Sequence, residues 1–307
     1  MMISIIVPTY NRVKDLSRLF DALVHQEDIH KNETEIIVVD NNSTDSTSEF
    51  ITNASRDMPL PLVYLFEKKQ GKTYALNTGI KCAKGEIIIF LDDDVIPEKK
   101  WFVSIADTFK NDHRVNMACG KILPLDMPSN LPSWCEWRRF RAVFGVTRYG
   151  EESRFLNECY SLPSGMNIAI RREALNSVGA FNNKFCGRGE DTEFCFRAQQ
   201  QSLRIYYIAA AILYHKIQLE KLTKEYFAEY FYTSGLARSQ FQRRFQFCPS
   251  VFNIPIWLSK EILYAGYVFL RELFLRGPNR AFSAYLELFY LAGCFRGRMK
   301  VRGEFFP

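Results

Sequence analysis

Three consecutive aspartates follow an apolar run, and this junction constrains the fold more than any other part of the sequence. The run EIIIF at residues 86–90 stands between Gly85 and the segment LDDD at residues 91–94. Its length and its boundaries predict a buried strand. Three carboxylates at the end of such a strand repel one another unless a cation or a hydrogen-bonding ligand lies among them. A solvated acidic turn before the next helix is the alternative, and the run alone does not decide between the two.

Strand and helix patterns alternate through the first 120 residues. Apolar side chains recur every three or four residues from Val13 to Val24, which predicts a helix. Ser43, Thr44 and Asp45 offer N-cap chemistry for a second helix that runs to about Asn53. The alternation predicts an α/β fold with a mostly parallel sheet and right-handed crossovers. Further helices are expected at 73–84 and 101–109, and strands at 3–7, 35–40, 62–67, 86–91 and 115–119.

Composition limits the class of protein. The chain has 307 residues, of which 47% are hydrophobic and 24% charged, so it is globular and forms one large or two small domains. Its eight cysteines include no C-x-x-C pair, which argues against a zinc ribbon and favours reduced thiols in a cytosol. The apolar segment at residues 3–7 is too short for the core of a signal peptide.

The net charge of +6 comes from the C-terminal part of the chain. From Tyr226 onward there are 11 Lys and Arg against 5 Asp and Glu, whereas the preceding 225 residues carry 29 of each. No nucleic-acid motif accompanies this basic region. We therefore expect no nucleic-acid partner, and a membrane surface as the anionic partner.

Four polar motifs follow strands or open helices in the α/β region. They are PTYN at residues 8–11, VVDNNSTD at 38–45, GKTYALNTG at 71–79 and DDD at 92–94. On a parallel sheet the carboxyl ends of the strands share one edge, so these residues converge on one crevice. Turn chemistry explains one such motif, but four at successive strand ends favour a ligand site.

With these motifs the chain resembles the family 2 glycosyltransferases, which have the Rossmann-like GT-A fold. The resemblance covers about residues 2–215 and includes SGMNIAIRR at residues 164–172 and GEDTEF at 189–194. Members of this family move a sugar from a nucleoside diphosphate to an acceptor and invert the anomeric carbon. The resemblance implies the same fold and reaction here.

For the donor, the resemblance implies that Asp40 hydrogen-bonds the nucleobase, with Pro8, Thr9 and Asn11 as the neighbouring wall. The Gly71–Gly79 segment resembles the loop and helix that close over the nucleoside, so Lys72 or Asn77 would reach ribose or phosphate. Many relatives have Arg where Leu76 stands, and Lys72 is a candidate for the missing positive charge.

For the metal, the resemblance makes Asp92 and Asp94 the D-x-D pair. Asp94 would bind the ion, Asp92 would contact ribose or the ion, and Asp93 would lie nearby. The leaving diphosphate needs its charge neutralised, and Mg²⁺ or Mn²⁺ does so as a Lewis acid. Oxygen ligands suit either ion. His215 follows the apolar run at residues 208–214 and is a candidate third ligand, with a purely structural role as the alternative.

For catalysis, Asp191 matches the general base of the family and would take a proton from the acceptor hydroxyl. It follows Glu190 at the expected start of a helix, whose N-terminus stabilises a carboxylate. The glycines on either side of Arg188 leave room for substrate, and Arg188 is a candidate contact to donor phosphate or to an acceptor anion. The alternative is that both acids only favour the helix dipole.

The C-terminal region is apolar and aromatic at residues 251–275 and 281–295. Lys260, Glu261, Arg271, Glu272 and Glu287 interrupt it too often for a spanning helix. Helices that lie in a membrane interface fit this mixture. The alternative is a helical subdomain that packs on the core or on another subunit, so a homo-oligomer is possible.

These inferences predict a GT-A domain at residues 1–222 and a helical, membrane-associated region at 223–307. The expected activity is an inverting, metal-dependent transfer from a nucleoside-diphosphate-sugar to a hydroxyl of a glycan or polyprenyl-linked acceptor. The expected place is the cytoplasm, on the cytoplasmic face of a membrane. Two alternatives are a sugar-phosphate nucleotidyltransferase and a non-catalytic nucleotide-sugar-binding scaffold subunit. The first needs a Gly-rich phosphate loop where this chain has PTYN, and the second needs no base.

Overall fold

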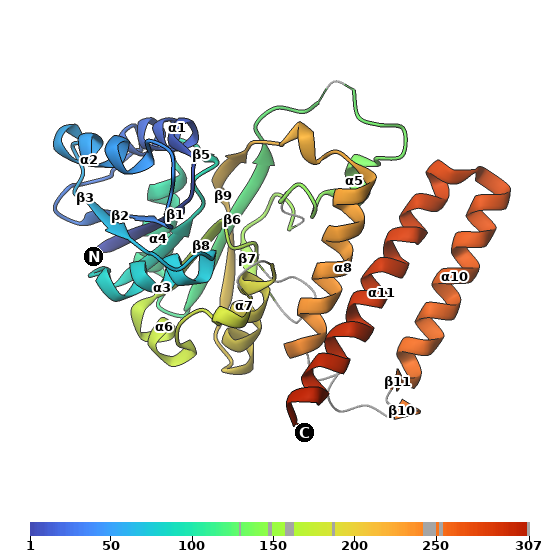
Figure 1. Cartoon of the computed structure of the whole chain (residues 1–307). Helices are drawn as coiled ribbons and strands as arrows, with labels where there is room; N and C mark the ends of the chain where they lie inside the picture. The colour runs from blue at the N-terminus through green and yellow to red at the C-terminus, as the bar shows by residue number, and fades with distance from the viewer. Residues whose placement is uncertain are drawn as a thin grey trace. The chain divides into compact units, whose positions relative to one another are not determined.

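The computed structural model describes residues 1–128, 130–146, 149–156, 163–185, 188–241, 250–251 and 254–305 (Figure 1). Gly187, on one side of Arg188 in the sequence, lies outside these ranges. The chain divides into two compact units. The first, called here the sheet unit, contains residues 1–127 and 144–217, and the second, the helical unit, contains 128–143 and 218–307.

The sheet unit is built on one mixed, mostly parallel sheet, as the sequence predicts. The strand order is β3-β2-β1-β4-β8-β6-β9-β5, with β7 beside β9. Strands β3, β2, β1 and β4 are parallel neighbours, and β6 and β9 run in the same direction as they do. The carboxyl ends of these strands therefore share one edge of the sheet. The strands are β1 (Ile3–Thr9), β2 (Thr34–Asp40), β3 (Leu62–Phe66), β4 (Ile87–Leu91), β5 (Val95–Pro97), β6 (Met117–Pro124), β7 (Arg154–Phe155), β8 (Asn167–Arg171) and β9 (Ile205–His215).

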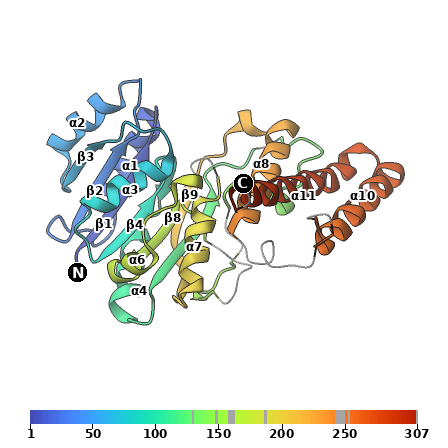
Figure 2. The ribbon, with the colours of Figure 1, turned by 60° about the horizontal axis from the view of Figure 1, so that its bottom comes forward.

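Helices cover both faces of this sheet (Figure 2). Side chains alternate along β1, so Ile5 and Val7 pack into one core while Ile6 packs into the other. The first core takes apolar residues from α1 (Val13–Val24), α2 (Thr47–Asp57) and α4 (Trp101–Asn111). The second takes them from α3 (Lys72–Cys82), α6 (Arg172–Val178) and α7 (Glu190–Gln200). A single 3-10 turn, η1 (Asn183–Phe185), precedes α7.

Most predicted elements of this unit are confirmed, with shifts at their ends. The helix at Val13–Val24 has the predicted bounds. The helix expected to start at residues 43–45 begins instead at Thr47, whose amide and hydroxyl donate to Oδ1 of Asp45 at 3.0 and 2.5 Å. Ser43 is used elsewhere, because its hydroxyl accepts the amide of Asn11 at 3.0 Å. The strand expected at 115–119 runs later, as β6.

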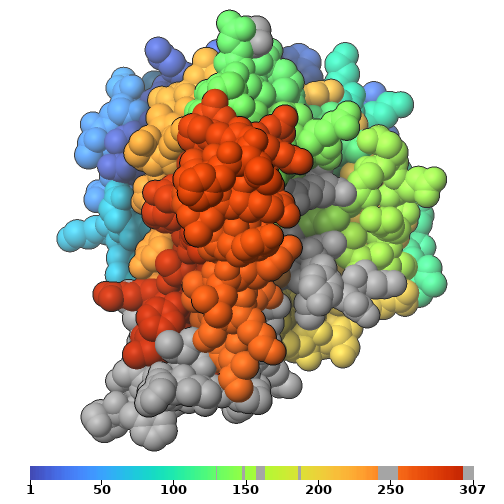
Figure 3. All heavy atoms as spheres, turned by 90° about the vertical axis from the view of Figure 1, so that its right-hand side faces the viewer, coloured from blue at the N-terminus to red at the C-terminus, as the bar shows by residue number. Residues whose placement is uncertain are grey.

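The helical unit contains α5 (Trp137–Phe140), η2 (Leu219–Lys221), α8 (Lys224–Phe241), α10 (Ile256–Arg276) and α11 (Pro278–Phe305), with a short hairpin of β10 (Ser250–Val251) and β11 (Ile254–Pro255). The structure places the division between the units at residues 217 and 218, rather than at 222 and 223, and adds residues 128–143 to the helical unit. In that segment Trp134 packs edge-on against Phe227 and Phe282 at 5.0 Å each. In the described ranges no helix has the length and apolar character needed to cross a membrane. Figure 3 shows the face that α10 occupies.

Candidate functional site

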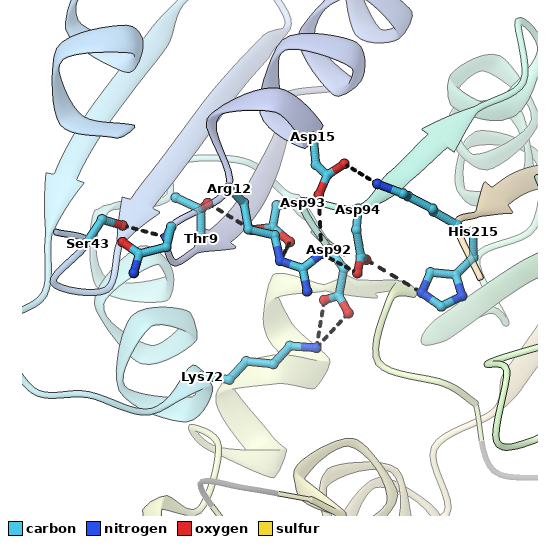
Figure 4. A network of polar contacts seen from close by, with 11 residues as sticks. Thr9, Arg12, Asp15, Ser43, Lys72, Asp92, Asp93, Asp94 and His215 are labelled. Carbon is cyan, nitrogen blue, oxygen red and sulfur yellow. Dashed lines mark hydrogen bonds and ion pairs between the residues drawn. The ribbon is translucent and has the colours of Figure 1, made fainter. Parts of the chain in front are cut away.

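The three aspartates lie at the carboxyl edge of β4, where the sequence predicts them. Thr9, at the end of the neighbouring β1, donates to Oδ2 of Asp93 at 2.8 Å. Asp93 is 8% exposed, and Asp92 and Asp94 are partly buried. The carboxylates therefore form a cluster partly withdrawn from water, not an acidic turn in solvent (Figure 4).

Two cationic side chains balance this carboxylate cluster. Arg12 places Nη1 2.8 Å from Oδ2 of Asp94 and Nε 3.8 Å from Oδ1 of Asp93. Lys72, the first residue of α3, places Nζ 2.6 Å from Oδ1 of Asp92. The sequence assigns Lys72 to the donor but gives Arg12 no role. Arg12 directly follows the motif at residues 8–11, and this position at the same edge of the sheet indicates a place in the site.

Burial and charge divide the cluster into carboxyls of different acidity. Burial, with the charge of Asp94 added, raises the pKa of Asp93 to about 7 although Arg12 and Thr9 oppose this. Burial also acts to raise the pKa of Asp94, but its interactions with His215 and Arg12 outweigh burial and hold that pKa well below its ordinary value. Between these two, Asp94 is therefore the carboxylate that is kept ionised.

His215 meets the cluster from the end of β9. Its Nε2 is 3.7 Å from Oδ1 of Asp94, and its Nδ1 is 3.0 Å from the carbonyl oxygen of Phe144. Burial acts to lower the pKa of His215, but the interaction with Asp94 outweighs burial and raises it. The structure thus brings His215 to Asp94, the residue with which the sequence analysis groups it as a candidate metal ligand.

Asp40 and Asn11 organise the two loops beside the cluster. Asp40 is 1% exposed, and its carboxylate accepts the amide of Ser43 at 2.9 Å and the hydroxyl of Tyr64 at 3.3 Å. Asn11 has a φ of +52°, and its Oδ1 accepts the amide of Thr44 at 2.8 Å. These contacts tie the loop after β1 to the loop after β2. Pro8 lies in the buried part of β1, in register with Val39 of β2.

Asn77 does not reach the carboxylate cluster. Its Nδ2 donates to the carbonyl oxygen of Phe181 at 2.9 Å, and its Oδ1 accepts the amide of Phe181 at 2.8 Å. The amide is thus used to fasten α3 to the segment before η1. These hydrogen bonds do not support the predicted contact of Asn77 with ribose or phosphate.

Glu190 and Asp191 form the start of α7. The Asp191 carboxylate accepts the amide of Gly165 on Oδ2 at 2.8 Å and the amide of Thr192 on Oδ1 at 2.7 Å. Glu190 lies 3.8 Å from Nζ of Lys72, and burial together with the charge of Asp191 raises its pKa to about 7. Lys72 therefore connects Glu190 of α7 to Asp92, which follows β4 by one residue. Arg188 is partly buried in the turn before α7.

The donors at this edge suit a hard divalent cation by type. Within the described ranges no group of three or more His, Cys, Asp or Glu side chains is arranged to hold a metal ion. Mg²⁺ and related ions are commonly held by one or two carboxylates, with substrate phosphates completing the shell. Asp92 and Asp94 fit that pattern, and their pairing with Arg12 and Lys72 shows that positive charge is stabilised among them.

Comparison with known proteins places this arrangement in a family. The chain matches Glycosyl transferase family 2 over residues 4–179. Glycosyltransferase AglE of Haloferax volcanii is 33% identical over 192 residues, which are 61% of this chain and 58% of AglE, so the match spans little more than half of that protein.

Two solved structures share the fold. Staphylococcus aureus TarS 1–349 in complex with UDP has a TM-score of 0.56 at 22% identity, covering 99% of this chain and 92% of TarS 1–349. Mannosyltransferase PcManGT of Pyrobaculum calidifontis, in complex with GDP-Man and Mn²⁺, has a TM-score of 0.61 at 18% identity, covering 96% and 86%. The expected GT-A fold is thereby confirmed. Because the family match covers more than half of its residues, this chain belongs to glycosyl transferase family 2.

Proposed function

We propose that the protein is an inverting, divalent-metal-dependent glycosyltransferase. It moves a sugar from a nucleoside-diphosphate-sugar to a hydroxyl of a glycan or of a polyprenyl-linked acceptor. The observation that carries this proposal is the position of Lys72, 2.6 Å from Asp92 and 3.8 Å from Glu190. One lysine thus connects Asp92, a carboxylate assigned to the donor, with Glu190, the neighbour of the assigned base Asp191. The UDP complex of TarS and the GDP-Man and Mn²⁺ complex of PcManGT support a nucleotide-sugar donor and a divalent cation.

In this proposal the donor lies along the carboxyl edge of β1, β2 and β4. Asp40 accepts a hydrogen bond from the nucleobase, and Pro8, Thr9 and Asn11 shape the wall beside it. Asp92 and Asp94, with His215 as a third ligand, would hold Mg²⁺ or Mn²⁺, and Asp93, which accepts the hydrogen bond of Thr9, lies nearby. The ion would neutralise charge on the diphosphate. Lys72 and Arg188 contribute positive charge beside the diphosphate.

The acceptor reacts at the N-terminus of α7. Asp191 takes the proton of the acceptor hydroxyl while that oxygen bonds to the anomeric carbon, and the bond from this carbon to the diphosphate breaks on the opposite face. The amides of Gly165 and Thr192 fix the orientation of the Asp191 carboxylate and leave lone pairs on both oxygens. Glu190, with its pKa raised to about 7, is a second group able to accept a proton near neutral pH.

Replacement of Asp191 tests the assignment of the base. Asp191→Asn should abolish sugar transfer while leaving nucleotide binding intact, measured as release of the nucleoside diphosphate and as a ligand-induced shift in Tm. Asp107→Asn, at an exposed position on α4, is the matched control and should change neither. Full turnover by Asp191→Asn would refute the assignment. Loss of turnover in Glu190→Gln alone would transfer the role to Glu190.

The nucleotide is identified by a panel of UDP-, GDP- and dTDP-sugars with and without Mn²⁺. A ligand that binds only the native state raises Tm, and the shift grows with the ratio of the ligand concentration to its Kd. The expected result is a shift with one nucleotide that grows when Mn²⁺ is present. No shift with any donor would remove the basis for a transferase and would favour a scaffold role.

The acceptor class follows from the C-terminal region, for which we propose membrane association on the cytoplasmic face. The net positive charge of the chain comes from the residues after position 225, that is from Tyr226 onward, and large apolar side chains are exposed on α10. Both features suit a protein that meets its acceptor at an anionic bilayer.

A further inference from the structure

The outward face of α10 concentrates exposed apolar side chains. Of the 14 large apolar side chains exposed in the described part of the chain, seven belong to this 21-residue helix. We call the following residues, with their exposed fractions, the α10 stripe: Leu263 (75%), Tyr264 (68%), Tyr267 (60%), Leu270 (51%) and Phe274 (83%). Spacings of three and four residues put them on one side of the helix. In Figure 3, α10 lies nearest the viewer.

The charge on this side of α10 is positive. Lys260 and Arg271 fall at helical spacing from stripe residues, three or four positions away from Leu263, Tyr264 and Tyr267, and both are exposed. Glu261 and Glu272 each follow one residue later, which turns them about 100° round the helix axis. Glu272 is further turned to two cations, with Arg271 at 2.7 Å and Arg276 at 3.4 Å. The cations Lys260 and Arg271 therefore outnumber the one acid at the same spacing, Glu261, which is exposed and stands three residues before Tyr264.

A pocket of about 610 Å³ opens beside the stripe within the helical unit. Its apolar lining includes Phe269 and Leu273 of α10 together with Phe282, Tyr285 and Phe289 of α11. On the α8 side the charged residues Lys224, Glu225 and Glu229 also line it. Phe269 and Leu273 directly precede the stripe residues Leu270 and Phe274 in the helix. The lining of the pocket on α10 therefore lies about 100° round the helix axis from the stripe.

From these observations we infer that α10 lies on an anionic lipid bilayer, with its stripe in the headgroup–acyl boundary and one lipid chain in the adjoining pocket. A bilayer supplies a flat apolar layer, negative charge and single chains small enough to enter the pocket. A second copy docked on the stripe by two-fold symmetry would bring Lys260 and Arg271 of both copies to one interface. The inference deepens the membrane association proposed above and rests on that proposal. It does not depend on which acceptor the enzyme uses.

Sedimentation with vesicles of equimolar phosphatidylcholine and phosphatidylglycerol tests the stripe. The full chain should bind these vesicles more tightly than pure phosphatidylcholine, and salt should weaken the binding. Leu270→Gln with Phe274→Gln should reduce the affinity at least about tenfold, because the variant removes two apolar side chains from the lipid boundary. The matched control is Phe66→Gln with Leu219→Gln, which removes exposed apolar side chains outside α10 and should leave binding unchanged.

The pocket is tested with Ala228→Leu, which adds bulk to its lining on α8. This variant should also weaken vesicle binding while keeping the helical circular dichroism of the parent chain. Equal binding by the stripe variant and its parent, or equal affinity for neutral and anionic vesicles, would overturn the inference. So would loss of a dimer, seen by sedimentation equilibrium, as the sole effect of the stripe variant.

Failure here is distinguishable from failure of the proposed sugar transfer. The stripe variant should retain the full nucleotide-induced shift in Tm, because α10 belongs to the helical unit and the nucleotide to the sheet unit. A chain that binds nucleotide but not vesicles would overturn the docking alone.

Discussion

Glu190 is expected to make the stability of the fold depend on pH. Burial and the neighbouring Asp191 raise its pKa from 4.5 to about 7, although Lys72 opposes the shift. The folded-state pKa lies above the unfolded value. Between these two pH values, therefore, the native protein keeps a proton on Glu190 that the unfolded chain has lost. The free energy of unfolding therefore falls as the pH rises from about 4.5 to about 7. At 1.36 kcal/mol per pKa unit the full loss is about 3 kcal/mol.

Glu190→Gln removes this titration while keeping the size of the side chain. Relative to the parent chain, the variant should gain about 2 to 3 kcal/mol in free energy of unfolding between about pH 5 and about pH 8. Urea denaturation followed by tryptophan fluorescence at a series of pH values measures the difference directly. Glu152→Gln, at an exposed position, should show a difference that does not change with pH. A pH-independent difference for Glu190→Gln would show that the carboxyl titrates normally and would refute the electrostatic reasoning.

Three other perturbations follow from local geometry. Gly293→Ala on α11 would put a Cβ 2.0 Å from the carbonyl oxygen of Tyr232 on α8 and should lower the free energy of unfolding, measured by urea denaturation, by about 1–3 kcal/mol. The control Gly266→Ala on α10 meets nothing within 4 Å and should leave this free energy unchanged or raise it by up to about 1 kcal/mol. Arg12→Gln removes the cation beside Asp93 and Asp94 and should tighten Mn²⁺ binding without nucleotide in calorimetry; unchanged or weaker binding would contradict competition for these carboxylates. Asn77→Ala should lower the free energy of unfolding by about 1–3 kcal/mol without changing nucleotide affinity, and a selective loss of affinity would restore its expected role at the ribose.

The sequence predicts the sheet and its acidic edge because both depend on local patterns. Residues 3–9 are mostly apolar and are buried on both faces, as a strand between two layers of helices requires, and the aspartates follow the strand that pairs with it. Strand direction then brings Asp40 and Asp92 to one edge, since the carboxyl ends of parallel strands coincide. The family and its fold could be inferred at this level and are confirmed.

What escaped prediction depends on contacts between distant residues. Asn77 bonds to a residue 104 positions away, and no local pattern distinguishes that partner from a bound ribose. Arg12 lies 82 positions before Asp94, so its pairing appears only when β1 and β4 are neighbours. No local pattern at residues 130–143 predicts that Trp134 packs edge-on against Phe227 of α8 and Phe282 of α11.

The pairing of Arg12 and Lys72 with the aspartates changes the reason for expecting a metal. Repulsion among three carboxylates does not by itself require an ion here, because two side-chain cations and His215 already lie among them. The need arises when a nucleoside diphosphate adds its own negative charge to this edge. Metal and nucleotide should therefore bind cooperatively rather than independently.

Reciprocal titrations test this cooperativity. Mn²⁺ should raise the affinity for the nucleoside diphosphate, and the nucleotide should raise the affinity for Mn²⁺ by the same factor, because the coupling free energy belongs to both ligands. Asp94→Asn should reduce this factor toward one, while Asp107→Asn should leave it unchanged. If Mn²⁺ binds as tightly to the nucleotide-free protein, the carboxylate cluster alone makes the metal site, and the charge of the diphosphate is not what recruits the ion.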